Sequence, residues 1–341
     1  MIKINSFNSD QKILKHLDKL DYFLNGHKTL VVAELDLTNK CNNRCPYCCG
    51  IKENGAQLTK KQIDMIANGL YEMGAKGVIL SGGGQPLISP HFEYAVRQLK
   101  QNGIKLGLNS NGLALTKEKA LIISEYFEYF RVSLDAGSPQ MYQITHGMPN
   151  TAYKKVIENA KLFSKIRNES DSKTSFGIGF LTSKLTENDM ENFVLVAKEC
   201  GADFAQFRPF TGDTYDLTGR IEKLQKSYND DTFIVNSSIQ KYREMHTKGK
   251  REYTKCRGMF FSTVITADAK VFACLHYRQE DRYFLGQISK NNSLEDIFKS
   301  SLIRKIFESI DCKECPTLCR NDAFNRTLDT LSLDINNSEF M

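Results

Sequence analysis

Two patterns of hydrophobic residues, one typical of strands and one typical of helices, alternate along the first two thirds of the chain. Short apolar runs typical of buried strands recur, and each is followed by a longer stretch with apolar positions at helical spacing. The predicted strands are 30–37, 77–80, 104–112 with its turn, 127–136, 175–183 and 203–210, and the predicted helices between them are 59–71, 91–103, 115–126, 151–167 and 187–200. Strands that alternate with helices predict a parallel sheet covered by helices.

The fold class expected from this order is α/β, a partial (β/α)6 barrel resembling a TIM barrel, followed by a small α+β domain. In such barrels the loops after the strands lie at one rim, and the active-site residues are found in these loops. The pattern changes after about Pro209. It predicts an N-terminal helical segment at 1–29, a core at 30–210, a helical linker at 211–250 and a second domain at 251–341, in which a hairpin precedes helices at 294–310 and after Cys319.

Composition and charge narrow the class of protein. The 341 residues are 41% hydrophobic and 25% charged, and the net charge of +6 comes from scattered lysines, so we expect a globular protein without a nucleic-acid partner. The first dozen residues are polar, and no apolar run approaches the ~18 residues of a membrane helix, so we expect a cytoplasmic protein with no membrane partner. Cytoplasmic thiols are reduced, which makes clustered cysteines candidates for metal or redox chemistry.

Four of the ten cysteines lie in the stretch NKCNNRCPYCCG, directly after the first predicted strand. Cys41, Cys45 and Cys48 have the spacing C-x3-C-x2-C, which can aim three thiolates at one point. Cys49 adjoins Cys48, so its side chain must diverge. A structural zinc site requires four ligands, whereas an iron–sulfur cluster with three cysteine ligands keeps one iron open. A zinc loop with a distant fourth ligand is the alternative.

The motif has an aromatic residue before its last cysteine and is followed by a strand that ends in GGG-x-P. Over roughly residues 30–210 it resembles the radical S-adenosylmethionine (SAM) superfamily. The resemblance implies that Cys41, Cys45 and Cys48 hold a [4Fe–4S] cluster whose open iron chelates the methionine part of SAM. An electron then cleaves SAM, and the 5′-deoxyadenosyl radical takes a hydrogen atom from the substrate.

The same resemblance implies a set of SAM contacts at the ends of the strands. Tyr47 is expected near the adenine, Gly82, Gly83, Gly84 and Gln85 around the methionine group, and Asn109, Asn111, Ser133, Asp135, Ile178 and Arg208 around the remainder of SAM or the substrate. Relatives often carry Glu at the position of Gln85, so this chain keeps an acceptor oxygen without its charge. Turn formation is the alternative role for the Asn and Asp residues, and a surface charge for Arg208.

Five more cysteines lie near the C-terminus, at Cys256, Cys274, Cys312, Cys315 and Cys319. A hairpin with two cysteines and a distant C-x2-C can enclose one metal centre, and a structural zinc is the alternative. The layout of residues 256–319 resembles the twitch domain, a shortened SPASM domain, which implies one auxiliary [4Fe–4S] cluster. We favour Cys319 as the spare thiol, with Cys312 as the other candidate.

Residues outside these two clusters have simpler expected roles. Cys200 is expected to be a packed core residue. Arg320, Asn321 and Arg326 are expected on a solvated helix face.

Three reactions are compatible with these features. The first is a two-electron oxidation in which the auxiliary cluster accepts the second electron. The second is epimerisation, which needs a thiol hydrogen donor, and Cys49 is the candidate catalytic residue. The third is a carbon–carbon or thioether link within a peptide. Relatives that modify peptides often bring a peptide-binding domain, and about 30 residues before the first strand are too few for one unless it is a separate protein.

We favour oxidation of a small polar substrate, such as a sugar, an aminocyclitol or a nucleotide-linked group. The family resemblance implies flavodoxin or ferredoxin as the electron donor. A non-catalytic protein that senses redox state or iron is the hypothesis from another class.

Overall fold

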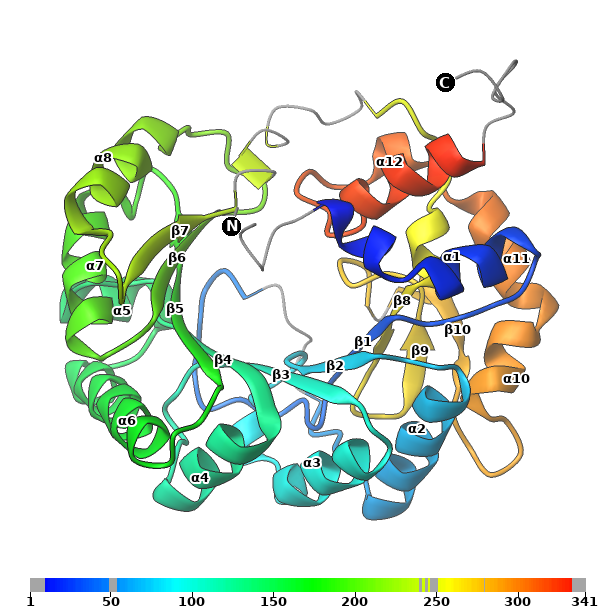
Figure 1. Cartoon of the computed structure of the whole chain (residues 1–341), viewed down its shortest axis with the longest axis horizontal. Coiled ribbons are helices and arrows are strands. Elements are labelled where there is room, and N and C mark those ends of the chain that lie inside the picture. The colour runs from blue at the N-terminus through cyan, green and yellow to red at the C-terminus, as the bar shows by residue number, and fades with distance from the viewer. Residues whose placement is uncertain are drawn as a thin grey trace.

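The computed structural model describes residues 10–48, 54–238, 241–242, 245, 251–278 and 280–332. Within them one sheet has the strand order β10-β9-β8-β1-β2-β3-β4-β5-β6-β7. Figure 1 shows the sheet curved into an open ring, with helices α2 to α8 around its outer face. No helix among the described residues is long and apolar enough to cross a bilayer.

The strands are β1 (Val32–Leu35), β2 (Gly77–Leu80), β3 (Lys105–Ser110), β4 (Phe127–Ser133), β5 (Ser175–Thr182), β6 (Phe204–Pro209), β7 (Ile234–Ser237), β8 (Ser262–Ile265), β9 (Lys270–Phe272) and β10 (Phe284–Gln287). The helices are α1 (Leu17–Leu24), α2 (Lys60–Glu72), α3 (Phe92–Gln101), α4 (Lys117–Tyr126), α5 (Pro139–His146), α6 (Asn150–Glu169), α7 (Met190–Glu199), α8 (Thr218–Tyr228), α10 (Leu294–Lys299), α11 (Ser301–Ser309) and α12 (Asp322–Leu331).

Alternation along the strands separates an apolar outer face from a polar interior. On β4, Phe130 is fully buried against Phe163 of α6, with ring centroids 4.8 Å apart. On β5, Phe180 packs in the same way on Phe193 of α7, at 4.7 Å. Each such ring contributes about 1.5–3 kcal/mol by its burial. The residues that alternate with these phenylalanines, such as Arg131 on β4, point to the other face of the sheet, which is the interior of the ring.

The C-terminal hairpin continues the core sheet. β8 pairs in parallel with β1, with Val32 opposite Ser262 and Leu35 opposite Ile265. The N-terminal segment packs on the same region, because the Phe23 ring lies 5.0 Å from that of Phe261. The auxiliary region is therefore joined to the barrel by backbone hydrogen bonds as well as by side chains. The domain boundaries that the sequence suggests stay a prediction.

The predicted α/β class with a partial barrel and a C-terminal auxiliary domain is confirmed. All six predicted core strands are present, and α2 begins where expected because Thr59 and Gln62 form a reciprocal capping box. The structure adds α5, β7 and β10, and it divides the predicted helix 294–310 into α10 and α11 at Ser300. In the predicted helical linker at 211–250, residues 239–240, 243–244 and 246–250 lie outside the described residues.

Candidate active site

The loop that carries Cys41, Cys45 and Cys48 is held between α5 and the loop after β2. The Arg44 amide donates to the His146 carbonyl at 3.1 Å, and the Gln85 amide donates to the Lys40 carbonyl at 2.8 Å. Burial, with Cys48 and Cys41 nearby, raises the pKa of the Cys45 thiol to about 12. Three thiols that oppose one another's ionisation suit a cationic metal cluster, which would stabilise their thiolate forms. Cys49 lies outside the described residues, so its predicted catalytic role stays a prediction.

The SGGGQP loop after β2 lies directly against the cysteine loop. A Cβ on Gly84 would lie 2.0 Å from the Lys40 carbonyl oxygen, and Gly82 has a φ of +115°, a conformation that favours glycine. Gln85 is 2% exposed, and its side-chain amide donates to Asn111 Oδ1. Glycine at these positions therefore lets the two loops approach each other as the SAM assignment requires.

The loop after β3 completes this arrangement. Asn111 Nδ2 donates to Asn42 Oδ1 at 2.8 Å, so the loops after β1, β2 and β3 are linked side chain to side chain. Asn109 Oδ1 is buried and has no hydrogen-bond partner among the described residues. A buried acceptor without a donor fits a ligand that supplies one, such as a hydroxyl or ammonium group of SAM.

The remaining predicted SAM contacts lie along the ends of β4, β5 and β6. Ser133 ends β4, and Asp135 Oδ1 accepts from the Leu181 amide at 2.7 Å, which ties the loop after β4 to β5. Tyr47 is 60% exposed and lies edge-on to Phe210, with ring centroids 5.6 Å apart. Arg208 Nε is buried without a partner among the described residues. These four assignments stay predictions that the geometry permits.

Ile178 is less well placed for contact with SAM. It is fully buried and lies on the same face of β5 as Phe176 and Phe180, which pack on the helices outside the sheet. Its neighbour Gly179 occupies the inner face, where a Cβ would lie 3.5 Å from Arg131 Cδ. The geometry therefore favours the backbone of Gly179 over the Ile178 side chain as a contact.

A buried charge network that sequence reasoning missed joins β1 to the C-terminal region. Arg278 donates from Nη1 to both Asp36 oxygens, at 2.9 and 3.0 Å, and from Nη2 to Glu34. Arg320 Nη1 donates to Glu34 Oε2 at 3.4 Å. Burial raises the pKa of Asp36 to about 7, against the opposing effects of Arg278 and of the Gly83 amide. The sequence did contain a signal for this network. In LVVAELDL the two acidic residues, Glu34 and Asp36, are two positions apart and therefore share one face of a buried strand.

All five C-terminal cysteines line one cavity. Asn325 Nδ2 and Asn321 Nδ2 donate to Cys256 Sγ at 3.6 and 4.0 Å. A hydrogen bond with Cys312, followed by those from the two asparagines, lowers the pKa of Cys256 to about 7 although burial raises it. The convergence fits an auxiliary cluster, because hydrogen bonds to ligand sulfurs stabilise the thiolate charge. Which thiol is spare stays open, since all five face the cavity.

Two other expectations can be compared with the structure directly. Cys200 is 1% exposed and packs in the core, as predicted. The solvated face expected for Arg320, Asn321 and Arg326 is wrong for the first two. Asn321 is 8% exposed and accepts at Oδ1 from the Ser262 hydroxyl at 3.0 Å, and Arg320 has a buried Nε and pairs with Glu34. Among the described residues, no three His, Cys, Asp or Glu side chains converge as the ligands of a single ion would.

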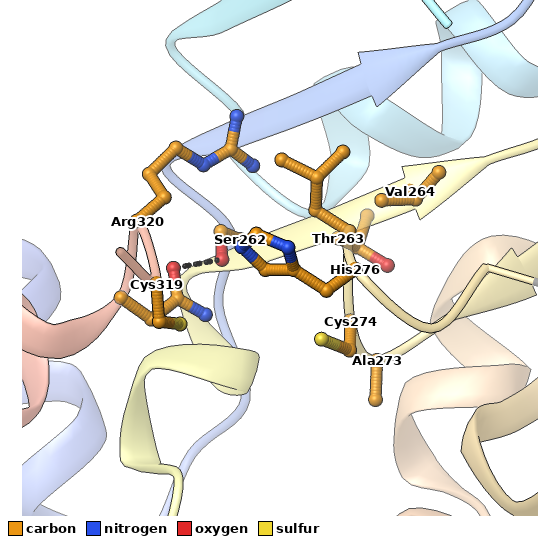
Figure 2. A pocket seen from close by; sticks show the side chains of 10 residues that line it. Ser262, Thr263, Val264, Ala273, Cys274, His276, Cys319 and Arg320 are labelled. Carbon is orange, nitrogen blue, oxygen red and sulfur yellow. Dashed lines mark hydrogen bonds between the residues drawn. The ribbon is translucent and has the colours of Figure 1, made fainter. Parts of the chain in front are cut away.

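A second cavity adjoins the cysteine cavity and is lined by β8 and by the segments of His276 and Arg320. Figure 2 shows His276 and Cys274 approaching β8 from one side and Cys319 and Arg320 from the other. The two cavities share Ala273, Cys274, Cys319 and Asn321. Burial, with Lys241 and Arg320, lowers the pKa of His276 to about 4, so its ring is neutral at pH 7.

Comparison with protein families agrees with this geometry. Residues 35–196 match the family described as the radical SAM superfamily, and residues 256–321 match an iron–sulfur cluster-binding domain, SPASM. The chain belongs to the radical SAM superfamily and carries a SPASM domain. Its cofactors are therefore SAM, the [4Fe–4S] cluster that binds SAM, and an auxiliary iron–sulfur cluster. The individual ligands of each cluster stay predictions.

The relatives of this radical SAM protein have varied names. A probable GTP 3′,8-cyclase of Methanococcus maripaludis is 32% identical over 131 residues, which are 37% of this chain and 44% of the relative. The chain thus spans less than half of that relative. A tungsten-containing aldehyde ferredoxin oxidoreductase cofactor-modifying protein of Pyrococcus furiosus is 22% identical over 317 residues, 82% of this chain and 86% of the relative.

Among solved structures, Streptococcus suis SuiB bound to its precursor peptide SuiA matches with a TM-score of 0.63 at 13% identity. The match covers 89% of this chain and 71% of SuiB. At this identity the likeness concerns the fold alone.

Proposed function

We propose that this radical SAM enzyme oxidises a small polar substrate by two electrons. The observation that carries the proposal is the shared wall of the two cavities. Cys274 and Cys319 line both of them, and the neighbouring Arg320 reaches Glu34 of β1 in the ring interior. An acceptor held by the C-terminal cysteines would therefore lie beside the space in which the substrate is exposed to the radical.

The electrons balance as follows. When bound, SAM and its cluster supply a carbon-centred radical that takes one hydrogen atom from the substrate. The second electron then passes to the auxiliary cluster, while a proton leaves to water, and the substrate gains a carbonyl or imine bond. A ferredoxin or flavodoxin is the proposed donor of the electron that starts the cycle.

The side chains at the end of the ring away from the predicted SAM residues support the proposal of a small substrate. A Cβ on Gly107 would lie 2.2 Å from the Tyr129 ring, and one on Gly177 would lie 2.1 Å from the Phe204 ring. These two aromatic side chains therefore occupy the inner faces of β3 and β5. We propose that the substrate lies nearer the rim, next to Asn109 and Ser133.

Mass spectrometry of metabolites tests the proposed reaction. Anaerobic extract of the source organism is incubated in deuterated water with reconstituted enzyme, SAM and reductant. We expect one compound to lose two hydrogens in proportion to 5′-deoxyadenosine, and the Cys274→Ala variant to cleave SAM without making that product. A product of unchanged redox level that carries solvent deuterium would replace oxidation with epimerisation.

A further inference from the structure

Three cationic side chains lie in the ring interior with no direct ion pair among the residues that the structure describes. They are Arg131 on β4, Arg208 on β6 and Lys241, which follows β7. A Cβ on Gly179 of β5 would lie 3.5 Å from Arg131 Cδ and 3.7 Å from Arg208 Nη2, so both arginines pass the same glycine. Lys241 is within electrostatic range of both guanidinium groups. We refer to these three residues as the interior cations.

The hydrogen-bonding capacity of this cluster is only partly used. Arg131 Nη1 donates to Gln206 Oε1 at 2.7 Å, which is a neutral partner. The Nε atoms of Arg131 and Arg208 are buried and have no partner among the described residues. Buried donors of this kind are costly unless a ligand accepts from them.

The two acids within electrostatic range of Arg131, which are Asp135 and Glu34, have other hydrogen-bond partners. Asp135 Oδ1 accepts from the Leu181 amide at 2.7 Å, and Glu34 is paired with Arg278 and Arg320. Burial, followed by Arg208, lowers the pKa of Arg131 to about 9. Burial, followed by Arg208 and Arg131, lowers the pKa of Lys241 to about 8. These shifts agree with an excess of positive charge in an enclosed space.

We propose that Arg131, Arg208 and Lys241 bind an oxyanion of the substrate, either a phosphate or a carboxylate. This inference rests on the proposed function and names its substrate class. A guanidinium presents its donors in a planar fork that matches oxyanions, and a lysine adds a point charge. The Tyr242 hydroxyl lies 2.7 Å from Thr182 Oγ1, which holds the segment of Lys241 against the end of β5.

The position of the interior cations favours the substrate over SAM itself. Arg131 precedes Ser133 by two residues on the same face of β4, so it lies about 7 Å further from the rim on which the SAM residues lie. Lys241 is also within electrostatic range of Cys319 and Arg320, on the auxiliary side. The oxyanion would therefore lie between the two clusters, and Arg208 would belong to the substrate site.

Anion titration of the reconstituted holoenzyme with saturating SAM tests this proposal. Inorganic pyrophosphate and citrate are the two probes, measured anaerobically by calorimetry, and iron content reports whether each variant is intact. Arg131→Gln and Lys241→Met, on separate elements, should each weaken binding of the preferred probe about 10- to 100-fold. The control Arg97→Gln changes an exposed arginine that pairs with Glu93 on α3 and should leave both affinities as in the wild type.

Each outcome has a distinct meaning. Binding of pyrophosphate alone identifies a phosphate, binding of citrate alone identifies a carboxylate, and binding of both supports the shared oxyanion site. The proposal is overturned if neither probe binds, or if the two variants lose affinity for SAM as much as for the anion. SAM cleavage without substrate is measured separately, so failure of the proposed function is distinguishable from failure of this site.

Discussion

At Gly84 the loop after β2 passes so close to the cysteine loop that a single added methyl group would clash with it. The Lys40 carbonyl oxygen would lie 2.0 Å from an added Cβ. We therefore expect Gly84→Ala to weaken SAM binding at least about 10-fold. Relieving the clash displaces the glycine loop, and a small displacement of a binding loop costs a positioned ligand its contacts. Equilibrium dialysis of anaerobically reconstituted protein measures the change.

The matched control for this prediction is Gly219→Ala on α8, where an added Cβ meets nothing within 4 Å. Alanine is the better helix former there, so SAM affinity should stay at its wild-type value and stability should rise by up to about 1 kcal/mol. Equal SAM affinities for the two alanine variants would contradict the placement of the glycine loop.

The pairing of Arg278 with Glu34 and Asp36 leads to a second prediction at the residue scale. Arg278→Met leaves the buried carboxylate of Asp36 without its cation and leaves Glu34 with Arg320 alone, which should lower the free energy of unfolding by about 3–5 kcal/mol. Urea denaturation followed by circular dichroism measures this loss. Arg97→Met, which removes an exposed ion pair with Glu93, should cost about 1 kcal/mol or less. A similar small loss for both variants would show that the network does not join β1 to the C-terminal region.

At the scale of the elements, the change between strand and helix periods was enough to predict the core strands and the helices that cover them. β7 and β10 were missed because their residues, IVNS and FLGQ, do not form the apolar run that marks the equally short β2, GVIL. The loop chemistry was predictable, since cysteines and glycines followed strands whose ends share a rim. The interior charges were not predictable, because charged residues such as Glu34, Arg131 and Lys241 are usually exposed. Only the curved sheet places their side chains in the interior.

The C-terminal hairpin and the segment after α11 together provide the auxiliary cysteines. We predict that Cys274→Ala loses about four irons per chain while Cys319→Ala keeps the full count. Cys200→Ala, which changes a core thiol far from both groups, is the control and should also keep it. Iron and zinc analysis of anaerobic protein decides the matter. Loss of a single zinc from Cys274→Ala would contradict the cluster assignment, and loss of iron from Cys319→Ala would make Cys312 the candidate spare thiol.

At the scale of the whole molecule, one continuous sheet places two cysteine groups at either end of a shared interior. β8 joins the core through β1, so the auxiliary region is fixed relative to the strand that precedes Cys41, Cys45 and Cys48. The buried ion pairs of Arg278 and Arg320 reinforce this junction. A fixed separation is what stepwise transfer of a hydrogen atom and then an electron requires.

Reductive cleavage of SAM in the absence of substrate is the most direct test of the central claim. Reconstituted wild-type enzyme with dithionite should form 5′-deoxyadenosine and methionine, Cys200→Ala should do the same, and Cys48→Ala should form neither. A wild-type enzyme that leaves SAM intact, or a Cys48→Ala variant that cleaves it at the wild-type rate, would contradict the account.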